Sequence, residues 1–441
     1  MKKVITLFFV LMGIWIFYSP FASAEVSLQQ QIDITPANGI IHLDNKVYSG
    51  NIVIKKPLTI VGSQNTVIRG DGKNNVVTIQ ASNVKLESLK IMHGSINRNT
   101  LEEYAGIKIT HANENVLKNI GISDSYHGVY LDYANNNLIE NIKVTGLGGN
   151  KIGEQGNGIH LNFSNHNRLF HSKIKETRDG IYFYKSEGNK VSDNLVEKTR
   201  YGLHYMYSDG NQFYHNRFTL NSAGAAIMVS RHIQLKDNEF SFHEGPKAFG
   251  ILMLESEDVQ VVNNQFFHNV RGIYIDNSFK NKVKDNKFSL NQVGIEVLSS
   301  SNNQIFTGNR FFDNTAPVIT DGVRSYNSWS DKGRGNYWGN GFPLSDLNQD
   351  GVGDFPIAYK SSLYKLLNEH ELAYLFMKSP AISLYEKLGQ LMNGQDIMFE
   401  DAYPLVEQKT SFPWTWMSPF ILAIGACYLL IRRRRKVKCT Y

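Results

Sequence analysis

Two consecutive stretches decide the fold: residues 180–201 read GIYFYKSEGNKVSDNLVEKTRY, and residues 202–223 read GLHYMYSDGNQFYHNRFTLNSA. Both begin with glycine, continue with alternating apolar residues, and carry Asn at the tenth and fifteenth positions. The glycine recurs at intervals of 22 residues, with two longer intervals of 30 and 26, at Gly106, Gly128, Gly158, Gly180, Gly202, Gly224, Gly250, Gly272 and Gly294. A fixed period of this length is the signature of a solenoid.

Each period contains three short apolar strands. Apolar residues stand one and three positions after the glycine, as in Ile181 and Phe183, and again at eleven and sixteen positions, as in Val191 and Val196. The eleventh-position series runs on to Ile305. Such alternation is typical of strands that point apolar side chains inward. The sequence therefore predicts an all-β fold, a right-handed parallel β-helix with coils of 22 residues.

Asparagines mark two corners of the predicted coils. One series stands nine positions after the glycine, at Asn115, Asn137, Asn167, Asn189, Asn211, Asn281 and Asn303, and a second at Asn194, Asn216, Asn238, Asn264 and Asn286. Asn adopts left-handed backbone angles more readily than most residues, and its amide can bond its counterpart one coil away. We interpret both series as structural ladders.

The two ends of the chain indicate its compartment. Lys2 and Lys3 precede an apolar run, residues 4–18, and Ala22-Ser23-Ala24 follows, which is the layout of a signal peptide over residues 1–24. The uncharged apolar residues 414–431 are close to the length that crosses a bilayer. The basic cluster 432–436 should stay cytoplasmic. We expect a single-pass protein of the cell membrane with an extracytoplasmic ectodomain.

Between these ends the sequence divides into segments of different character. We expect an N-terminal cap with the first coils at 25–105, regular coils at 106–330, an N-Y-W element with an Asp/Asn-rich turn at 331–360, and a helical segment at 361–411. The helices are expected at 362–378 and 381–392. One transmembrane helix at 414–431 and a basic tail at 432–441 complete the chain.

Charge and cysteine content exclude several functions. The chain carries a net charge of +6, but the signal and tail supply the excess, so the ectodomain is close to −2. This balance argues against nucleic-acid binding. The two cysteines, Cys427 and Cys439, lie in the expected membrane span and the tail. The ectodomain therefore has neither a disulfide nor a thiolate ligand.

The outward positions of the first strand form the most informative surface. They lie two and four residues after each glycine, and in the middle coils they hold His160, Tyr182, Tyr184, His204, Met206 and Met228. We take these six as candidate binding residues. Thioether and imidazole groups suit Cu(I), so His204, Met206 and Met228 are candidate copper ligands. The alternatives are an amphipathic patch covered by a partner or a loop, or a surface that holds a sugar ring.

Acidic residues on the same face are scattered. Asp132, Asp276 and Glu296 do not form a close pair of the kind that glycoside hydrolysis requires. The sequence shows no convincing catalytic constellation, and we expect a protein that is not an enzyme.

A second constellation lies near the end of the repeats. Asp346, Asn348, Asp350 and Asp354 place side-chain oxygens around the turn glycine Gly351. A short loop of this kind can wrap Ca²⁺, although Ile357 stands where an EF-hand has its bidentate Glu. We expect a structural calcium ion here, with an ordinary Asp/Gly-rich turn as the alternative.

The chain resembles the NosD family, the exported β-helix subunits of the copper-processing ABC system for nitrous oxide reductase. The resemblance rests on coils such as Gly272-Ile273-Tyr274-Ile275, on GNYWG at 335–339, and on DLNQDGVGDFP at 346–356. It implies an accessory protein that works with an ABC permease and ATPase, and with a copper chaperone or the reductase, to mature the copper centres, with copper held transiently. The anchor at 414–431 departs from the family's soluble form and leaves the partner set open. A cell-surface polysaccharide-binding or polysaccharide-processing β-helix is the alternative function.

Overall fold

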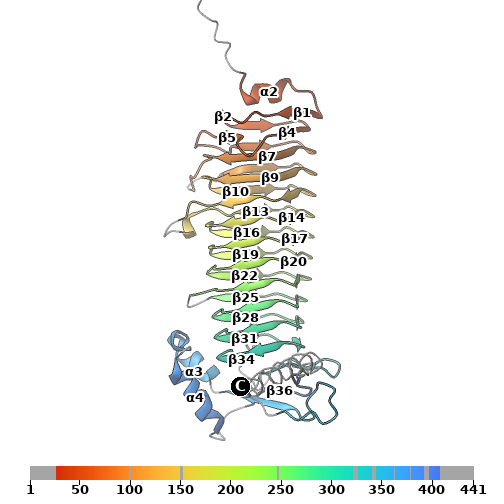
Figure 1. The fold of residues 1–441 in the computed structure, drawn as a ribbon, viewed down its shortest axis with the longest axis vertical. Helices are drawn as coiled ribbons and strands as arrows, with labels where there is room; N and C mark the ends of the chain where they lie inside the picture. Colours follow the sequence, from red (N-terminus) through yellow and green to blue (C-terminus); the bar gives the residue numbers. More distant parts are fainter. Residues whose placement is uncertain are drawn as a thin grey trace, which may run out of the picture.

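The computed structural model describes residues 26–98, 101–148, 152–245, 248–320, 326–339, 344–361, 363–377, 379–391 and 397–407. These residues form a right-handed parallel β-solenoid of about 12 turns, with the C-terminal helices at one end (Figure 1). The predicted β-helix is confirmed. The expected signal peptide, membrane span and basic tail lie outside the described residues. Within the described residues, no helix is both long enough and apolar enough to span a bilayer.

One face of the solenoid is a parallel sheet of 12 strands, here called the long-strand sheet. Its strands are β3 (Ile52–Ile54), β6 (Val77–Ile79), β8 (Ala105–Thr110), β10 (His127–Asp132), β13 (Ile159–Asn162), β16 (Asp179–Tyr184), β19 (Tyr201–Met206), β22 (Ala223–Met228), β25 (Phe249–Leu254), β28 (Arg271–Asp276), β31 (Val293–Val297) and β34 (Ala316–Thr320).

The other two faces belong to a second parallel sheet of 22 mostly three-residue strands. They are β1 (Gly39–His42), β2 (Val47–Ser49), β4 (Leu58–Val61), β5 (Val67–Arg69), β7 (Lys85–Met92), β9 (Val116–Ser123), β11 (Leu138–Glu140), β12 (Lys143–Thr145), β14 (Arg168–Phe170), β15 (Lys173–Lys175), β17 (Lys190–Ser192), β18 (Leu195–Glu197), β20 (Gln212–Tyr214), β21 (Arg217–Thr219), β23 (Gln234–Lys236), β24 (Glu239–Ser241), β26 (Gln260–Val262), β27 (Gln265–Phe267), β29 (Lys282–Lys284), β30 (Lys287–Ser289), β32 (Ile305–Thr307) and β33 (Arg310–Phe312).

The inward positions predicted from the repeat are the core. Ile181, Phe183, Val191 and Val196 are completely buried, as are their counterparts in the neighbouring coils. In the last coils the sixteenth-position residues are stacked phenylalanines, with ring centroids 4.7–5.2 Å apart from Phe218 through to Phe311. A continuous apolar column of this kind stabilises each coil through its neighbours.

The repeated glycine is required by space. A Cβ atom on Gly180 would lie 2.2 Å from Val196 Cγ1 and 2.6 Å from the carbonyl oxygen of Gly202. The equivalent glycines of the other regular coils face the same two neighbours, a core side chain and the next glycine's carbonyl, except that Gly294 faces the carbonyl of Pro317. Any side chain here would push the sheet and its neighbouring corner apart.

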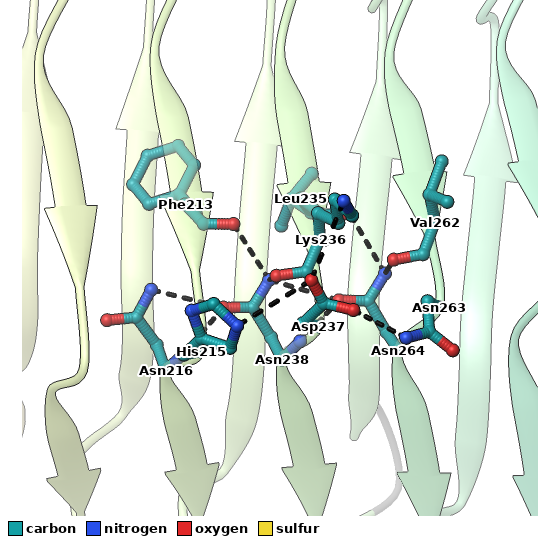
Figure 2. A network of polar contacts seen from close by, with 10 residues as sticks. All are labelled: Phe213, His215, Asn216, Leu235, Lys236, Asp237, Asn238, Val262, Asn263 and Asn264. Atoms are coloured by element: carbon teal, nitrogen blue, oxygen red, sulfur yellow. Dashed lines mark hydrogen bonds and ion pairs between the residues drawn. The ribbon is translucent and has the colours of Figure 1, made fainter.

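Asparagine ladders connect the coils at the corners (Figure 2). The Asn238 backbone N–H donates to Asn264 Oδ1 at 2.8 Å, and its side-chain amide donates to Asn264 Oδ1 and to the Phe213 carbonyl at 3.0 and 2.9 Å. The left-handed backbone conformation belongs to the residue before each rung, such as Asp237 with φ 58° and Asn263 with φ 54°. Our assignment of that conformation to the ladder asparagines is therefore wrong. The ladder residues instead satisfy buried backbone groups with their side chains.

The coil that begins at Gly294 is one residue longer than the period, because Ala316 pairs with Val293 and Pro317 stands opposite the glycine. The ladder rung is consequently Gln304, whose Oε1 accepts from the Asn281 N–H at 3.1 Å. Asn303 is the left-handed corner residue, and Phe306 faces the core in place of Ile305. Both sequence assignments in this coil are wrong by one position.

The N-Y-W element is the C-terminal cap of the solenoid. Asn336 is the last rung of one ladder, and Trp338 continues the phenylalanine column at 4.8 Å from Phe311. Asp401 closes both, since its Oδ2 accepts from the Asn336 N–H at 2.7 Å and from Trp338 Nε1 at 2.8 Å. Asp401 ends β36 (Ile397–Asp401), which pairs antiparallel with β35 (Ile357–Lys360).

Short helices complete the described chain. A capping helix, α2 (Leu28–Ile34), covers the N-terminal end, and a single 3₁₀ turn, η1 (Ile152–Glu154), lies in an inserted loop. The C-terminal helical segment is small and consists of α3 (Leu363–Glu369), the 3₁₀ helix η2 (Glu371–Phe376) and α4 (Pro380–Leu391). Its apolar side packs against residues of β31 and β34.

Candidate functional site

The six candidate binding residues lie on the outer face of the long-strand sheet. Strand register pairs His160 with Tyr182 and Tyr182 with His204 in one column. In the next column Tyr184 pairs with Met206, and Met206 pairs with Met228. The structure thus brings all six side chains onto one continuous surface that spans strands β13, β16, β19 and β22.

Histidine and tyrosine alternate along the first column. The centroid distances are 4.7 Å from Tyr130 to His160, 4.5 Å from His160 to Tyr182, and 4.8 Å from Tyr182 to His204, all with edge-to-face geometry. Tyr182 therefore separates the two imidazoles, which cannot share one metal ion. Burial, followed by the charges of His127, His204 and Arg178, lowers the pKa of His160 well below its ordinary value, so that its imidazole is neutral.

A buried carboxylate orients His204. Asp179 Oδ2 lies 2.9 Å from His204 Nδ1, and its two oxygens accept from Arg200 Nε and Arg200 Nη2 at 2.8 and 2.6 Å. Burial opposes the ionised form of Asp179, but the hydrogen bonds and charges of His204 and Arg200 outweigh it and hold its pKa below the usual value. Histidines that bind metals commonly carry such a carboxylate on the second ring nitrogen. Because Asp179 occupies Nδ1, Nε2 is the ring nitrogen left for a ligand, and His204 as a whole is buried, with an exposed fraction of 9%.

Sequence reasoning missed Asp179. Its only signal is that it is the one acidic residue directly before a repeat glycine, where the other coils have Ala, His, Asn, Tyr, Phe, Arg or Val. Asp179 begins β16 and stands three residues before Tyr182, the register partner of His204, whereas Met206 stands two residues after His204. The hydrogen bond from His204 to Asp179 therefore points toward the N-terminal end of the strands, and Met206 lies toward their C-terminal end.

The methionines border an apolar cluster. Met228 packs with Leu252 and Tyr274 against the buried Ala226 and Phe249. Met206 and Met228 are both partly exposed. Strand register makes the two methionines neighbours in the second column, beyond Tyr184, and adjacent coils can offer both sulfurs to one soft cation.

A second polar group next to His160 was also missed. His127 is buried, accepts a hydrogen bond from the Asn157 N–H on Nδ1 at 2.8 Å, and approaches Glu103 Oε2 with Nε2 at 2.6 Å. Because an amide N–H can only donate, the imidazole proton is on Nε2 and points to Glu103. This hydrogen bond lowers the pKa of Glu103. Glu103 precedes the first regular coil, so the repeat could not reveal it.

The acidic residues of this face have structural partners. Glu296 pairs with Arg271 Nε at 2.6 Å and accepts from the Tyr374 hydroxyl at 2.7 Å, which ties η2 to the sheet. Asp276 accepts from Ser300, and Asp132 from Asn162. Across the part of the chain that the structure describes, no group of three or more His, Cys, Asp or Glu side chains is arranged to hold a metal ion.

The predicted calcium loop folds over its own amides. Asp346 accepts from the backbone N–H groups of Asp350 and Gly351 at 3.1 Å each, and Asp354 Oδ2 accepts from the Leu347 N–H at 2.9 Å. Asn348 Oδ1 also accepts from the Asp350 N–H, at 3.2 Å. The four predicted ligands thus share one turn, but these oxygens bond the turn's own amides. Calcium binding stays a prediction.

Comparison with known families identifies two matching regions. A family described as periplasmic copper-binding protein (NosD) matches residues 141–341, and one described as right handed beta helix region matches residues 51–218. The first region contains all six candidate binding residues and the N-Y-W cap.

Curated relatives carry the same family name. The chain is 27% identical over 143 residues to the probable ABC transporter binding protein NosD of Stutzerimonas stutzeri, which covers 32% of each protein. It is 26% identical over 146 residues to the protein of the same name from Pseudomonas aeruginosa, over 32% of this chain and 33% of that one. The chain thus matches about a third of the length of these relatives.

Solved structures share the fold at low sequence identity. The Dettilon tailspike protein gp208 superposes with a TM-score of 0.52 at 14% identity, over 66% of this chain and 63% of that one. The Streptococcus pneumoniae surface adhesin PfbA gives 0.51 at 13%, over 67% and 87%. These likenesses concern the β-solenoid alone. Taken with the fold and the cap, the family match over residues 141–341 and the curated relatives support a NosD-type β-helix protein.

Proposed function

We propose that this protein is an exported, membrane-tethered accessory protein of a copper-processing ABC transporter system. In this proposal it serves to mature the copper centres of nitrous oxide reductase, together with the permease, the ATPase and a copper chaperone or the reductase itself. The observation that carries the proposal is the coincidence of the NosD match with the coils that present His160, His204, Met206 and Met228 on one face.

Copper in this proposal is cargo, and the chain's own residues supply a soft docking place. Met206 and Met228 offer two thioethers from adjacent strands, and His204 offers Nε2 while Asp179 holds its Nδ1. Thioether and imidazole ligands without thiolates suit Cu(I) and hold it weakly enough to be passed on. His160 lies beyond Tyr182, where it can serve a second station or contact the protein partner.

A role without catalysis is part of the proposal. The alternative, a polysaccharide-binding β-helix, has one observation in its favour, which is a column of exposed and partly exposed rings at the edge of the long-strand sheet. His111, Tyr133 and Phe163 form it. However, these rings stack nearly parallel at 5.1 and 4.9 Å, so each covers the ring face on which a sugar would pack. The copper function therefore has the stronger support.

The test is deletion of the gene in its own host, followed by purification of nitrous oxide reductase. The proposal predicts a copper-poor reductase that wild-type protein restores, and co-purification of an ATPase and a permease with the full chain from membranes. A reductase with full copper content in the deletion strain would overturn the proposal. Binding of the purified chain to acidic or neutral cell-surface glycans would then favour the alternative.

The membrane tether has a separate test. Protease added to intact protoplasts should remove the ectodomain and spare an epitope placed after Tyr441. Protection of the ectodomain would contradict the proposed topology.

A further inference from the structure

The C-terminal helical segment is apolar on two sides. Its inner side, with Leu363, Leu367, Tyr374, Met377 and Ile382, is buried against β31 and β34. Its outer side, here called the outer helical face, exposes large apolar side chains on both η2 and α4, with exposed fractions of 40–73%: Leu372, Leu375, Phe376, Leu384, Tyr385 and Leu388. A helix that is apolar all round is normally covered on both sides.

Helical spacing places the exposed apolar side chains of each helix on the side away from its buried residues. In α4 the buried Ile382 and Glu386 are four residues apart, and so are the exposed Leu384 and Leu388 on the other side. In η2, Leu372 and Leu375 are three residues apart, which is one full turn of a 3₁₀ helix. Both helices lie at the same end of the solenoid, since Tyr374 of η2 bonds Glu296 of β31 and Ile382 of α4 belongs to the same apolar cluster as residues of β31 and β34; Figure 1 shows α4 beside this end.

Chain length places the proposed membrane span close to the cap end of the solenoid, which also carries the helical segment. Leu405 is fixed to the cap, since its N–H donates to the Asn336 carbonyl at 2.9 Å. The described chain ends at Glu407, and the apolar run begins at Trp414. Seven residue steps reach at most about 25 Å even when fully extended. The cap end of the solenoid must therefore stand within that distance of the start of the apolar run.

From these observations we infer that the outer helical face rests in the interfacial region of the lipid bilayer. It would fix the solenoid to the membrane at two places, the proposed span and this face, and so limit its tilt toward its partners. Exposed Leu, Phe and Tyr side chains on a helix suit that boundary, because the apolar body inserts while polar groups stay hydrated. The inference rests on the proposed membrane tether, and it is independent of the copper role.

The experiment uses the full chain in lipid nanodiscs, with Cys427 and Cys439 replaced by Ser. A spin label is attached at Leu388→Cys on the outer helical face or, as a matched control, at Tyr207→Cys in the middle of the solenoid. The two native side chains are similarly exposed, at 48% and 45%. The inference predicts that the label at 388 is accessible to oxygen and shielded from a water-soluble nickel chelate, whereas the label at 207 is open to the chelate. Unchanged melting curves check the fold of both variants.

Equal access of the chelate to both labels would overturn the inference. Shielding at 388 that appears only when the permease is added, or that grows with protein concentration, would assign the face to the permease or to a second copy and would also overturn it. A reductase that matures normally without this protein would remove the copper proposal and leave the labelling result unaffected. Release of the full chain from membranes by salt alone would remove the tether on which the inference rests.

Discussion

His243→Asn should make the protein more stable at neutral pH and much less sensitive to acid. His243 is completely buried at a corner where three neighbouring coils have the ladder residues Asn221, Asn269 and Asn291. Its Nδ1 lies 3.2 Å from the Asn221 carbonyl and its Nε2 has no partner. Among the described residues, the Asn221 N–H also has no acceptor, although the rungs above and below it are complete.

The magnitude follows from these groups. An Asn at this position would accept from the Asn221 N–H, and an unsatisfied buried donor costs about 1–3 kcal/mol. Burial lowers the pKa of His243 from 6.5 to about 4. Between these values the unfolded chain binds a proton that the folded chain does not, so stability falls as the pH drops from about 6.5 to about 4 and is constant below. The difference between the two pKa values corresponds to about 3 kcal/mol of unfolding free energy. Wild type should lose this stability in acid, and His243→Asn should keep it.

Urea unfolding at pH 7.5 and at pH 4 measures both effects. His166→Asn, at an exposed corner, is the matched control for the loss of an imidazole. We expect His243→Asn to gain about 1–3 kcal/mol at pH 7.5 and a further amount of about 3 kcal/mol at pH 4. If wild type and His243→Asn lose stability in parallel on acidification, the imidazole is not held neutral in the folded state and the reasoning fails.

Three further predictions concern the core, the cap and the loop. Phe240→Asp should lower the free energy of unfolding by several kcal/mol, because it places an unpaired charge in the aromatic column. The control Phe279→Asp, at a partly exposed corner, should lower it little. Equal melting temperatures of the two variants would refute the assignment of Phe240 to the core. Asp401→Ala should lower the free energy of unfolding by about 1–3 kcal/mol for each donor left unsatisfied, whereas the control Glu400→Ala should leave it unchanged. An Asp401→Ala variant that melts like wild type would contradict the role of Asp401 in closing the solenoid. A chelator should lower the melting temperature of wild type and not of Asp350→Ala; no effect on wild type means an ordinary turn.

Sequence periodicity predicted the solenoid because every coil buries apolar residues at the same positions of the repeat. The glycine, the inward positions and the ladder rungs recur at fixed offsets, so a single alignment of the coils locates them. The method failed at Gln304 and Phe306, where one extra residue shifts the register. It also could not distinguish the ladder residue from the left-handed residue before it, since Asn suits both positions.

Features outside the repeat were not predictable. Asp401 closes a ladder that ends 65 residues earlier in the chain, and no local pattern connects it with Asn336. Asp179 and Glu103, which hold His204 and His127, stand at positions where other coils have unrelated residues. The outer face itself was predictable because alternation fixes which side chains point outward, whereas the partners of those side chains depend on neighbouring coils and inserted loops.

The central claim is that the methionines of this face handle copper for the reductase. The most direct test changes Met206 and Met228 together to Leu, which keeps the apolar volume and removes both sulfurs, so folding should survive. We predict that the double variant melts like wild type, loses Cu(I) binding by the full chain, and yields a copper-poor reductase in cells. Full maturation of the reductase by the double variant, with no Cu(I) bound by the wild-type chain either, would contradict the claim.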